Sequence, residues 1–443
     1  MKKKYFLIVL VLVGMAPSVI AQIETNTNAL LSNPIIKTGH LGISIYEPAT
    51  EKYWYNYNAE KLFIPASNTK LFTLYVGMKF LGNQLTGISY NDTRDTFFVL
   101  PSGDPTFLHE DFLNQPVFEL LKKTQKPIVI INQNQQIQPY GNGWVWDDQS
   151  EAYAAQRNAF PIYGNLLQLK WTKKNNIQKD SFAYDLNVLN GNISDFEFLK
   201  KTNTESIDNL IIKTPGKNKF EVSLNGKSNQ ISQEVPFETN GIETGVHFLQ
   251  QKLGKLLTLK SNKIKKETFK PLYSQKTDTF FKIMMHRSDN FYAEQTLLMA
   301  SEKHLGYLSE IDIIDTLLKT TFKDIPQQPR WVDGSGLSRY NLFSPQDFIY
   351  ILNKLQTDYG YEKLEYILPT GGKGTLANYY KSDSGFIFAK TGSMSNNITL
   401  SGFIKTRKHK ILLFAIMLNN YVGSGKLVRK QFENYLHELI LQN

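Results

Sequence analysis

The chain has 443 residues, of which 41% are hydrophobic and 20% are charged, a composition typical of two or three globular domains. Disordered and collagen-like proteins are excluded. Lysine and arginine total 50 against 40 for aspartate and glutamate, a net charge of +10, but no block of five or six like charges occurs, so nucleic acid is not indicated as a partner.

The first predicted element is a secretory leader over residues 1–21. Three lysines follow Met1, an apolar run covers residues 5–13, and small residues precede Gln22. The apolar run is shorter than the roughly 18 residues of a membrane span, which favours a leader over a retained anchor or a buried helix. We expect cleavage after Ala21 and an exported protein, in the periplasm or elsewhere in the cell envelope.

The next elements are a β-hairpin, a helix and a β-rich region. Residues 39–57 alternate between apolar and polar side chains on both sides of a polar turn, which predicts two paired strands. A helical pattern then runs from Pro65 to Gly82 and places Ser67 at its start. Residues 90–265 are rich in asparagine, glutamine and lysine with short strand-like runs, which indicates a separate β-rich region.

The last part of the chain predicts helices, then strands, then a final helix. Helical patterning covers residues 279–298 and 344–355, and strands are expected at 386–390, 398–405 and 411–418. The final helix carries an apolar stripe, for which packing on a sheet is favoured over contact with a membrane surface.

This order of elements predicts an α+β fold with a discontinuous domain. Residues 22–89 and 266–443 are expected to form one domain, because the first third alone is too small to bury a core. Residues 90–265 are then a large β-rich insertion of one or two subdomains.

The sequence lacks the residue patterns of several classes of enzyme, and these classes are therefore disfavoured. None of the seven histidines has a partner four residues away or a carboxylate cluster in zinc-ligand spacing, so no metal site is expected. Zero cysteines exclude disulfides and a cysteine nucleophile. Nucleophile-elbow, Walker and dinucleotide-binding glycine motifs are also missing, and we expect no cofactor. The remaining candidate for catalysis is a serine nucleophile with a lysine as its base.

Ser67-Asn68-Thr69-Lys70 is the single Ser-x-x-Lys of the chain. Its place at a helix start puts the hydroxyl and the amine on one face. A lysine whose pKa is depressed by burial and nearby positive charge can take the proton of a serine nucleophile. Alone, however, a capping serine followed by a surface lysine is the more frequent explanation of such a tetrapeptide.

Two further segments indicate a function only when they are considered together with Ser67–Lys70. Ser288-Asp289-Asn290 heads a helical run like an ordinary capping cluster, and Lys390-Thr391-Gly392-Ser393 follows a strand like an ordinary turn. In this order the three segments resemble the signature motifs of the penicillin-recognising serine enzymes, which are the penicillin-binding proteins and the serine β-lactamases. The resemblance implies that Ser67 opens a helix, Ser288 lies on a loop across a cleft, and Lys390 lies on the edge strand of an antiparallel sheet with flanking helices.

The long separation in sequence between Lys70 and Ser288 points to one family among the penicillin-recognising enzymes. A large insertion there is typical of the D-alanyl-D-alanine carboxypeptidase and endopeptidase family known as class C low-molecular-mass penicillin-binding proteins, peptidase family S13. The segments 102–106, 143–148, 333–341 and 374–376 also resemble that family. For the glycine-rich segment 333–341 we favour a structural role beside the cleft.

The resemblance implies a role for each motif residue. Ser67 attacks the carbonyl of a D-alanyl peptide bond, Lys70 accepts its proton, Ser288 passes a proton to the leaving amine, and Asn290 holds Lys70 and the substrate amide. The backbone N–H groups of Ser67 and Ser393 form an oxyanion hole. The resemblance also implies that the substrate-binding residues are Lys390, Thr391, Gly392 and Ser393. Of these, Lys390, Thr391 and Ser393 are implied to bind the terminal carboxylate of the stem, and Lys390 also helps to keep Lys70 neutral. The implied partners are peptidoglycan stem peptides and, as covalent inhibitors, β-lactam antibiotics.

Two alternatives stay open beside this peptidase hypothesis. A β-lactamase is disfavoured by the insertion, and because Glu-x-x-Leu-Asn occurs only at residues 110–114 and 221–225, before the second motif rather than after it. A non-catalytic envelope-binding protein is disfavoured because no motif residue is missing. The sequence leaves open the balance between carboxypeptidase and endopeptidase, the diamino acid of the stem, the oligomeric state and any peripheral membrane contact.

Overall fold

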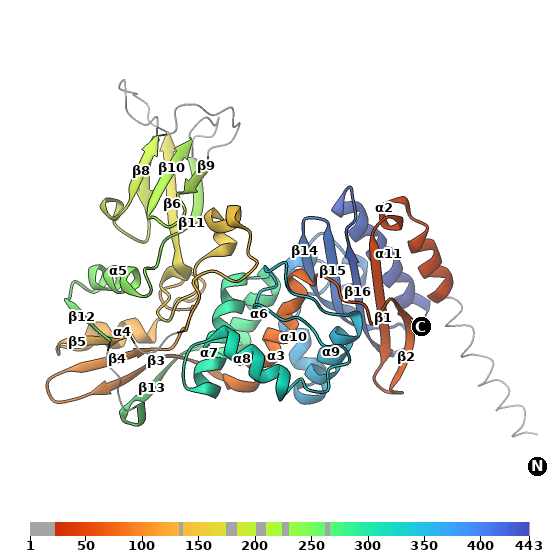
Figure 1. Ribbon diagram of the computed structural model, residues 1–443, viewed down its shortest axis with the longest axis horizontal. Coiled ribbons are helices and arrows are strands. Elements are labelled where there is room, and N and C mark those ends of the chain that lie inside the picture. The colour runs from red at the N-terminus through yellow and green to blue at the C-terminus, as the bar shows by residue number, and fades with distance from the viewer. Residues whose placement is uncertain are drawn as a thin grey trace, which may run out of the picture. The chain divides into compact units, whose positions relative to one another are not determined.

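The computed structural model describes residues 23–132, 136–173, 184–200, 210–223, 230–261 and 266–442. The predicted leader lies outside these residues. The chain divides into two compact units, one made of Met1–Tyr75, Asp278–Asp289 and Ile314–Asn443, the other of Val76–Thr277 and Asn290–Ile313 (Figure 1). Of the helices in the described ranges, none combines the length and the apolar character needed to cross a membrane.

The first unit is built on a five-stranded antiparallel sheet. The order β14-β15-β16-β1-β2 places strands from the two ends of the chain side by side, because β1 pairs with β16. β14 is an edge strand. The bounds are β1 His40–Glu47, β2 Lys52–Tyr57, β14 Ile387–Met394, β15 Asn397–Lys405 and β16 Ile411–Asn419.

Helices cover this sheet. α11 buries Val428, Phe432 and Leu436 in one core with alternate residues of β1, β15 and β16, which confirms the predicted core helix. α9 contacts β1 and β16, and it begins at a capping box between Ser344 and Asp347. The helices with residues in this unit are α2 Pro34–Lys37, α3 Lys70–Phe80, α6 Thr277–Arg287, α8 Glu310–Lys319, α9 Pro345–Tyr359, α10 Tyr361–Ile367 and α11 Gly425–Gln442, with the 3-10 turns η1 Ala66–Thr69, η7 Gly374–Leu376 and η8 Lys381–Asp383.

Two boundaries differ from the sequence-based expectation. The helical patterning expected over residues 279–298 forms two helices, α6 and α7, which are separated at Ser288, where the φ of 60° lies outside the range of a right-handed helix. The strand predicted to end at Lys390 continues to Met394, since residues 391–394 pair in register with β15. The third motif therefore lies within the edge strand, as the resemblance implied.

The second unit is rich in strands, as predicted for the insertion. It has a five-stranded sheet in the order β12-β5-β4-β3-β13 and two three-stranded sheets, β11-β6-β7 and β8-β10-β9. Its bounds are β3 Gln84–Asp92, β4 Phe97–Pro101, β5 Ile128–Ile131, β6 Leu166–Lys173, β7 Tyr184–Val188, β8 Glu197–Lys200, β9 Leu210–Lys213, β10 Lys219–Ser223, β11 Gln230–Pro236, β12 Leu257–Lys260 and β13 Lys270–Lys276, with α4 Pro116–Lys123, α5 Glu243–Leu253, α7 Asn290–Leu305 and the 3-10 turns η2 Trp146–Ser150, η3 Ala152–Ala154, η4 Tyr163–Asn165, η5 Ile193–Asp195 and η6 Lys266–Thr268.

This unit extends beyond the 90–265 expected from composition. β3 pairs with β13, so residues 84–92 and 270–276 belong to one sheet. α7 joins the same unit through side chains in its first two turns, where Gln295 donates to the carbonyl oxygens of Gly103 and Asn158 at 2.7 and 2.9 Å. Composition could not show these pairings, because they join segments far apart in the chain.

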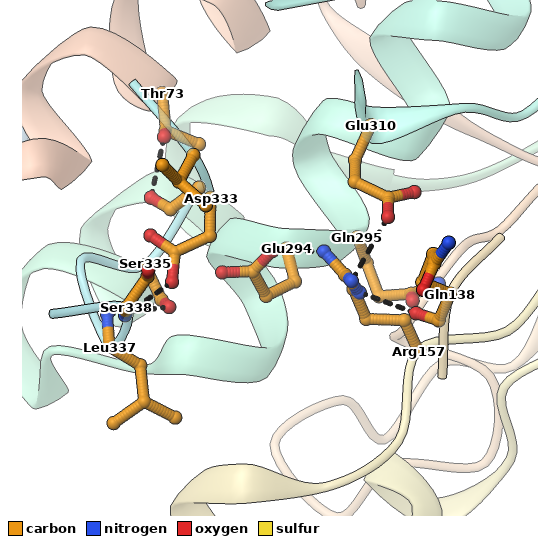
Figure 2. A network of polar contacts seen from close by, with 12 residues as sticks. Thr73, Gln138, Arg157, Glu294, Gln295, Glu310, Asp333, Ser335, Leu337 and Ser338 are labelled. Atoms are coloured by element: carbon orange, nitrogen blue, oxygen red, sulfur yellow. Dashed lines mark hydrogen bonds and ion pairs between the residues drawn. The ribbon is translucent and has the colours of Figure 1, made fainter. Parts of the chain in front are cut away.

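A buried arginine ties three segments of the second unit together (Figure 2). Arg157 donates from Nη1 to Glu294 on α7 and from Nη2 to Glu310 on α8, both at 3.0 Å, and from Nε to the Gln138 carbonyl at 2.9 Å. All three charged side chains are at most 2% exposed. Because a buried charge is tolerated only when it is paired and hydrogen-bonded, this arrangement fixes the segment around Arg157 against α7.

Candidate active site

Ser67 and Lys70 lie where the 3-10 turn η1 runs into α3. The Lys70 Nζ donates to the Ser67 Oγ at 3.0 Å. The same amine donates to the carbonyl oxygen of Ser335 at 2.7 Å, and Lys70 is fully buried. A serine hydroxyl within hydrogen-bond reach of a buried amine is the arrangement that nucleophile activation needs.

The position of α3 depends on an aromatic cluster in the first unit. Phe72, five residues after Ser67, contacts the rings of Phe322, Trp331, Phe343 and Phe348 at centroid distances of 4.7 to 5.8 Å. Thr73 on the same helix donates to the Gly334 carbonyl at 2.6 Å. The aromatic packing and the Thr73 hydrogen bond therefore fix the start of α3, which limits movement of the Ser67 hydroxyl and the Lys70 amine.

The segment 333–341 is the support for Lys70 that the sequence did not reveal. The buried Asp333 carboxylate accepts hydrogen bonds from the N–H groups of Gly336 and Ser338 at 2.8 and 2.6 Å, and from Asn341 at 2.7 Å. Figure 2 shows Asp333 beside Ser335 and Ser338. These bonds shape a tight loop that presents the Ser335 carbonyl to Lys70. We favoured a structural role beside the cleft for this segment, and the loop contacts the Lys70 amine directly.

Gly336 permits the loop to approach the turn that carries Ser67. Its φ is +81°, and a Cβ on it would lie 1.9 Å from the carbonyl oxygen of Ala66, the residue before Ser67. Only glycine fits both the conformation and the space. Ala66 itself has a φ of 47°, so the backbone on both sides of this contact is constrained.

Lys390 and Ser288 form a second amine–hydroxyl pair. The Lys390 Nζ donates to the Ser288 Oγ at 2.8 Å and to the Thr391 carbonyl at 2.7 Å, and Lys390 is fully buried. Ser288 occupies the left-handed turn between α6 and α7. The neighbouring Asp289 pairs with Arg287 at 2.9 Å, in agreement with the structural role expected for it.

The edge of the sheet is joined to the turn that carries Ser67. Thr399 on β15 donates to the Pro65 carbonyl at 2.7 Å, and Asn68 donates to the Ser401 hydroxyl at 2.7 Å. Gly392 faces the same turn, since a Cβ on it would lie 2.6 Å from the Pro65 carbonyl oxygen. Gly392 thus allows β14 to lie close to Ser67, and an edge strand keeps one side of its backbone available for an extended peptide.

The remaining predicted residues are placed as follows. Asn290 is the first residue of α7 and belongs to the second unit, where its Nδ2 donates to the Tyr153 carbonyl at 3.1 Å. Its expected role in holding Lys70 stays a prediction. Thr391 is half-buried and Ser393 is exposed at the end of β14, where its Oγ accepts a hydrogen bond from Arg429.

Within the described ranges, no group of three or more acidic or histidine side chains is positioned to hold a metal ion.

Burial and the charge of Lys70 hold the pKa of Lys390 well below its usual value of 10.5. Each of two neighbouring buried amines disfavours a proton on the other. A neutral amine is the form that accepts a proton from a serine.

The lowered pKa of Lys390 predicts that the protein becomes more stable as pH rises toward 10.5. In that range the unfolded chain holds a proton on this lysine that the folded chain has released, so unfolding takes up a proton and the free energy of unfolding rises with pH. The rise is at most about 1.4 kcal/mol per pH unit for one proton. Denaturant unfolding at pH 7.5 and 9.5 measures it, and Lys390→Met should show a smaller rise; a wild-type rise no larger than that of the variant would contradict the assignment.

Comparison with known proteins agrees with this geometry. The model of the D-Ala-D-Ala carboxypeptidase 3 (S13) family matches residues 23–440. Penicillin-sensitive carboxypeptidase A of Dictyostelium discoideum is 24% identical over 438 residues, which cover 85% of this chain and 82% of that protein.

Two solved structures share the fold. Penicillin binding protein 4 (dacB) from Haemophilus influenzae superposes with a TM-score of 0.74 at 18% identity, over 95% of this chain and 99% of that one. The penicillin G acylated Bd3459 predatory endopeptidase from Bdellovibrio bacteriovorus superposes with a TM-score of 0.50 at 13% identity, over 92% and 93%. With the sheets and helices described above, these likenesses confirm the predicted fold class.

Proposed function

This chain belongs to the D-Ala-D-Ala carboxypeptidase 3 (S13) family of peptidases, and on that premise we propose that it cleaves D-alanyl peptide bonds in peptidoglycan stem peptides through an acyl-enzyme on Ser67. The observation that carries the proposal is the 3.0 Å hydrogen bond between the Lys70 Nζ and the Ser67 Oγ, with the amine buried and held by the Ser335 carbonyl. Serine and lysine alone suffice for this chemistry when the lysine is neutral.

In the proposed acylation step, the Ser67 Oγ attacks the carbonyl carbon of the bond before the terminal D-alanine. A C–O bond forms as the hydroxyl proton passes to the neutral Lys70 amine. The backbone N–H groups of Ser67 and Ser393 stabilise the oxyanion of the tetrahedral intermediate. The C–N bond then breaks as a proton reaches the leaving amine through Ser288, which releases D-alanine and leaves an ester on Ser67.

In the second step a water molecule attacks the ester. The C–O bond to Ser67 breaks, the hydroxyl regains a proton, and the shortened stem peptide leaves with a new carboxylate. The contact between Lys390 and Ser288 supports the proton relay, because it holds the Ser288 hydroxyl within hydrogen-bond reach of a second amine, at 2.8 Å. Asn290 is proposed to orient the substrate amide.

β-Lactams are proposed to acylate Ser67 by the same first step. A relative of this chain is called penicillin-sensitive, and a structural neighbour is described as acylated by penicillin G. For this chain the support is the chemistry of the site, since a strained amide that resembles the substrate can form the same ester. A slow second step makes the protein a penicillin-binding peptidase, and a fast one makes it a β-lactamase.

We further propose that the protein acts in the periplasm or elsewhere in the cell envelope. Support comes from the leader pattern of residues 1–21 and from the substrate class, which is located outside the cytoplasm. Carboxypeptidase and endopeptidase action are both proposed for the one site, because both cut a D-alanyl bond.

A pulse of fluorescent penicillin followed by a chase tests the function. The expected result is a long-lived adduct on the tryptic peptide of residues 62–70, identified by mass spectrometry, with D-alanine released from pentapeptide substrates. Heat-denatured protein and protein saturated with unlabelled penicillin are the controls. Rapid loss of the label with release of penicilloate would move the assignment to β-lactamase, and the absence of any adduct on folded protein would contradict the proposed mechanism.

A further inference from the structure

Arg429 on α11 reaches the end of the edge strand that carries the third motif. Its Nη2 donates a hydrogen bond to the Oγ of Ser393, which is exposed at the end of β14. Gly425 lies one helical turn before Arg429, and a Cβ on Gly425 would lie 3.3 Å from the Arg429 Nη1. The missing side chain leaves room for the guanidinium to lie along the helix toward the strand.

The charge of Arg429 is not neutralised by a nearby acid. No carboxylate in the described part of the chain lies within ion-pair distance of its guanidinium. The acid one turn further along α11, Glu433, is engaged elsewhere: it pairs with Lys430 at 2.8 Å and accepts a hydrogen bond from the Tyr380 N–H at 2.6 Å. A guanidinium has five N–H donors, so the bond to Ser393 leaves several of them for a ligand.

A permanent cation is needed at this site to bind the terminal carboxylate of the substrate peptide. A peptide that ends in D-alanine carries a carboxylate next to the bond that is cut. Lys390 is a poor sole partner for it, because its amine is buried, is directed at Ser288 and the Thr391 carbonyl, and has a lowered pKa. Arginine remains charged at every physiological pH and binds a carboxylate with two parallel hydrogen bonds.

We propose that Arg429 binds the C-terminal carboxylate of the substrate peptide at the end of β14, together with Ser393, and so sets the preference for substrates with a free terminal carboxylate. This inference rests on the proposed peptidase function and adds to it a residue from outside the three motifs. Arg429 acts on substrate binding, and the acyl transfer remains with Ser67 and Lys70.

A matched pair of substrates tests the role of Arg429. An acylated D-alanyl-D-alanine peptide and the same peptide with a C-terminal amide differ only in the group that Arg429 is proposed to bind. In Arg429→Gln, kcat/KM for the acid should fall about 10- to 100-fold, as expected for loss of a charge-assisted bidentate contact, while kcat/KM for the amide stays within about twofold. Arg429→Lys should recover part of the loss, because it keeps the charge without the planar fork.

Lys430→Gln is the control, since it removes the same charge from the next residue of α11, whose side chain is 58% exposed and paired with Glu433. It should leave the acid-to-amide preference unchanged. An equal loss on both substrates in Arg429→Gln, or no loss on either, would overturn the inference while leaving the peptidase function intact. A wild-type protein that cleaves neither peptide and forms no adduct on Ser67 would overturn the function, and the inference with it.

Discussion

Ser67→Ala is expected to abolish covalent labelling by penicillin and to lower D-alanine release by at least about 10⁴-fold, since removing the nucleophile of an acyl-transfer site removes the pathway itself. The fold should persist. Lys70 loses the Ser67 hydroxyl as a hydrogen-bond partner but keeps the Ser335 carbonyl at 2.7 Å, so no buried amine is left without an acceptor. In-gel fluorescence measures the labelling, and chromatography of a pentapeptide digest measures the release.

Ser395→Ala is the matched control for this loss. Ser395 is an exposed serine in the turn after β14, and the hydrogen bond that Asn397 donates to it goes to its backbone carbonyl, which alanine retains. This variant should label and hydrolyse like the wild type, with an unchanged thermal midpoint in both variants. Full labelling of folded Ser67→Ala would show that the nucleophile lies elsewhere in the chain.

Gly336→Ala is expected to disable the site although the substitution changes no residue of the three motifs. The new Cβ would lie 1.9 Å from the Ala66 carbonyl oxygen and 2.8 Å from the Thr69 Oγ1, and the φ of +81° would add strain. We expect a loss of about 3 to 4 kcal/mol in the free energy of unfolding, the sum of overpacking and a left-handed backbone. The acylation rate should fall at least about 100-fold, because a displacement of Ser67 or the Ser335 carbonyl by an ångström misplaces the reacting groups.

Gly385→Ala separates the close contact from the backbone strain. Gly385 lies in the same unit with a similar φ of +78°, but no atom lies within 4 Å of the Cβ that would be added. This control should lose only about 1 kcal/mol and keep its acylation rate. Thermal midpoints and stopped-flow acylation of the two variants measure the difference. Equal behaviour of Gly336→Ala and Gly385→Ala would mean that segment 333–341 does not position the nucleophile.

Local geometry explains what the sequence predicted well. Three residues of spacing at a helix start place a hydroxyl and an amine together whatever the rest of the chain does, so the contact between Ser67 and Lys70 followed from the tetrapeptide and its position. Apolar, strand-like runs in the last third likewise predicted the strands β14, β15 and β16, which are buried over most of their length. The order of the three motifs then indicated the family, which the match over residues 23–440 shows.

Helix continuity and strand length were less predictable. Helical patterning occurs on both sides of Ser288, and the left-handed φ of that residue separates α6 from α7 where the capping cluster stands. The edge strand continues past Lys390 because β15 offers it partners as far as Asn397. In both cases a neighbouring element decides where the local pattern stops.

The sequence by itself determined the family of this protein, because the motifs serine–lysine, serine–asparagine and lysine–threonine–glycine occur in the order that this family shares. It also excluded a cysteine nucleophile, because the chain has no cysteine. Only the tertiary structure decided what holds those groups: the Ser335 carbonyl on Lys70, the contact between Lys390 and Ser288, and the approach of Arg429 to Ser393. Each of these contacts joins residues that are distant in the chain. Their formation depends on how helices and strands pack around a shared core, which no local pattern encodes.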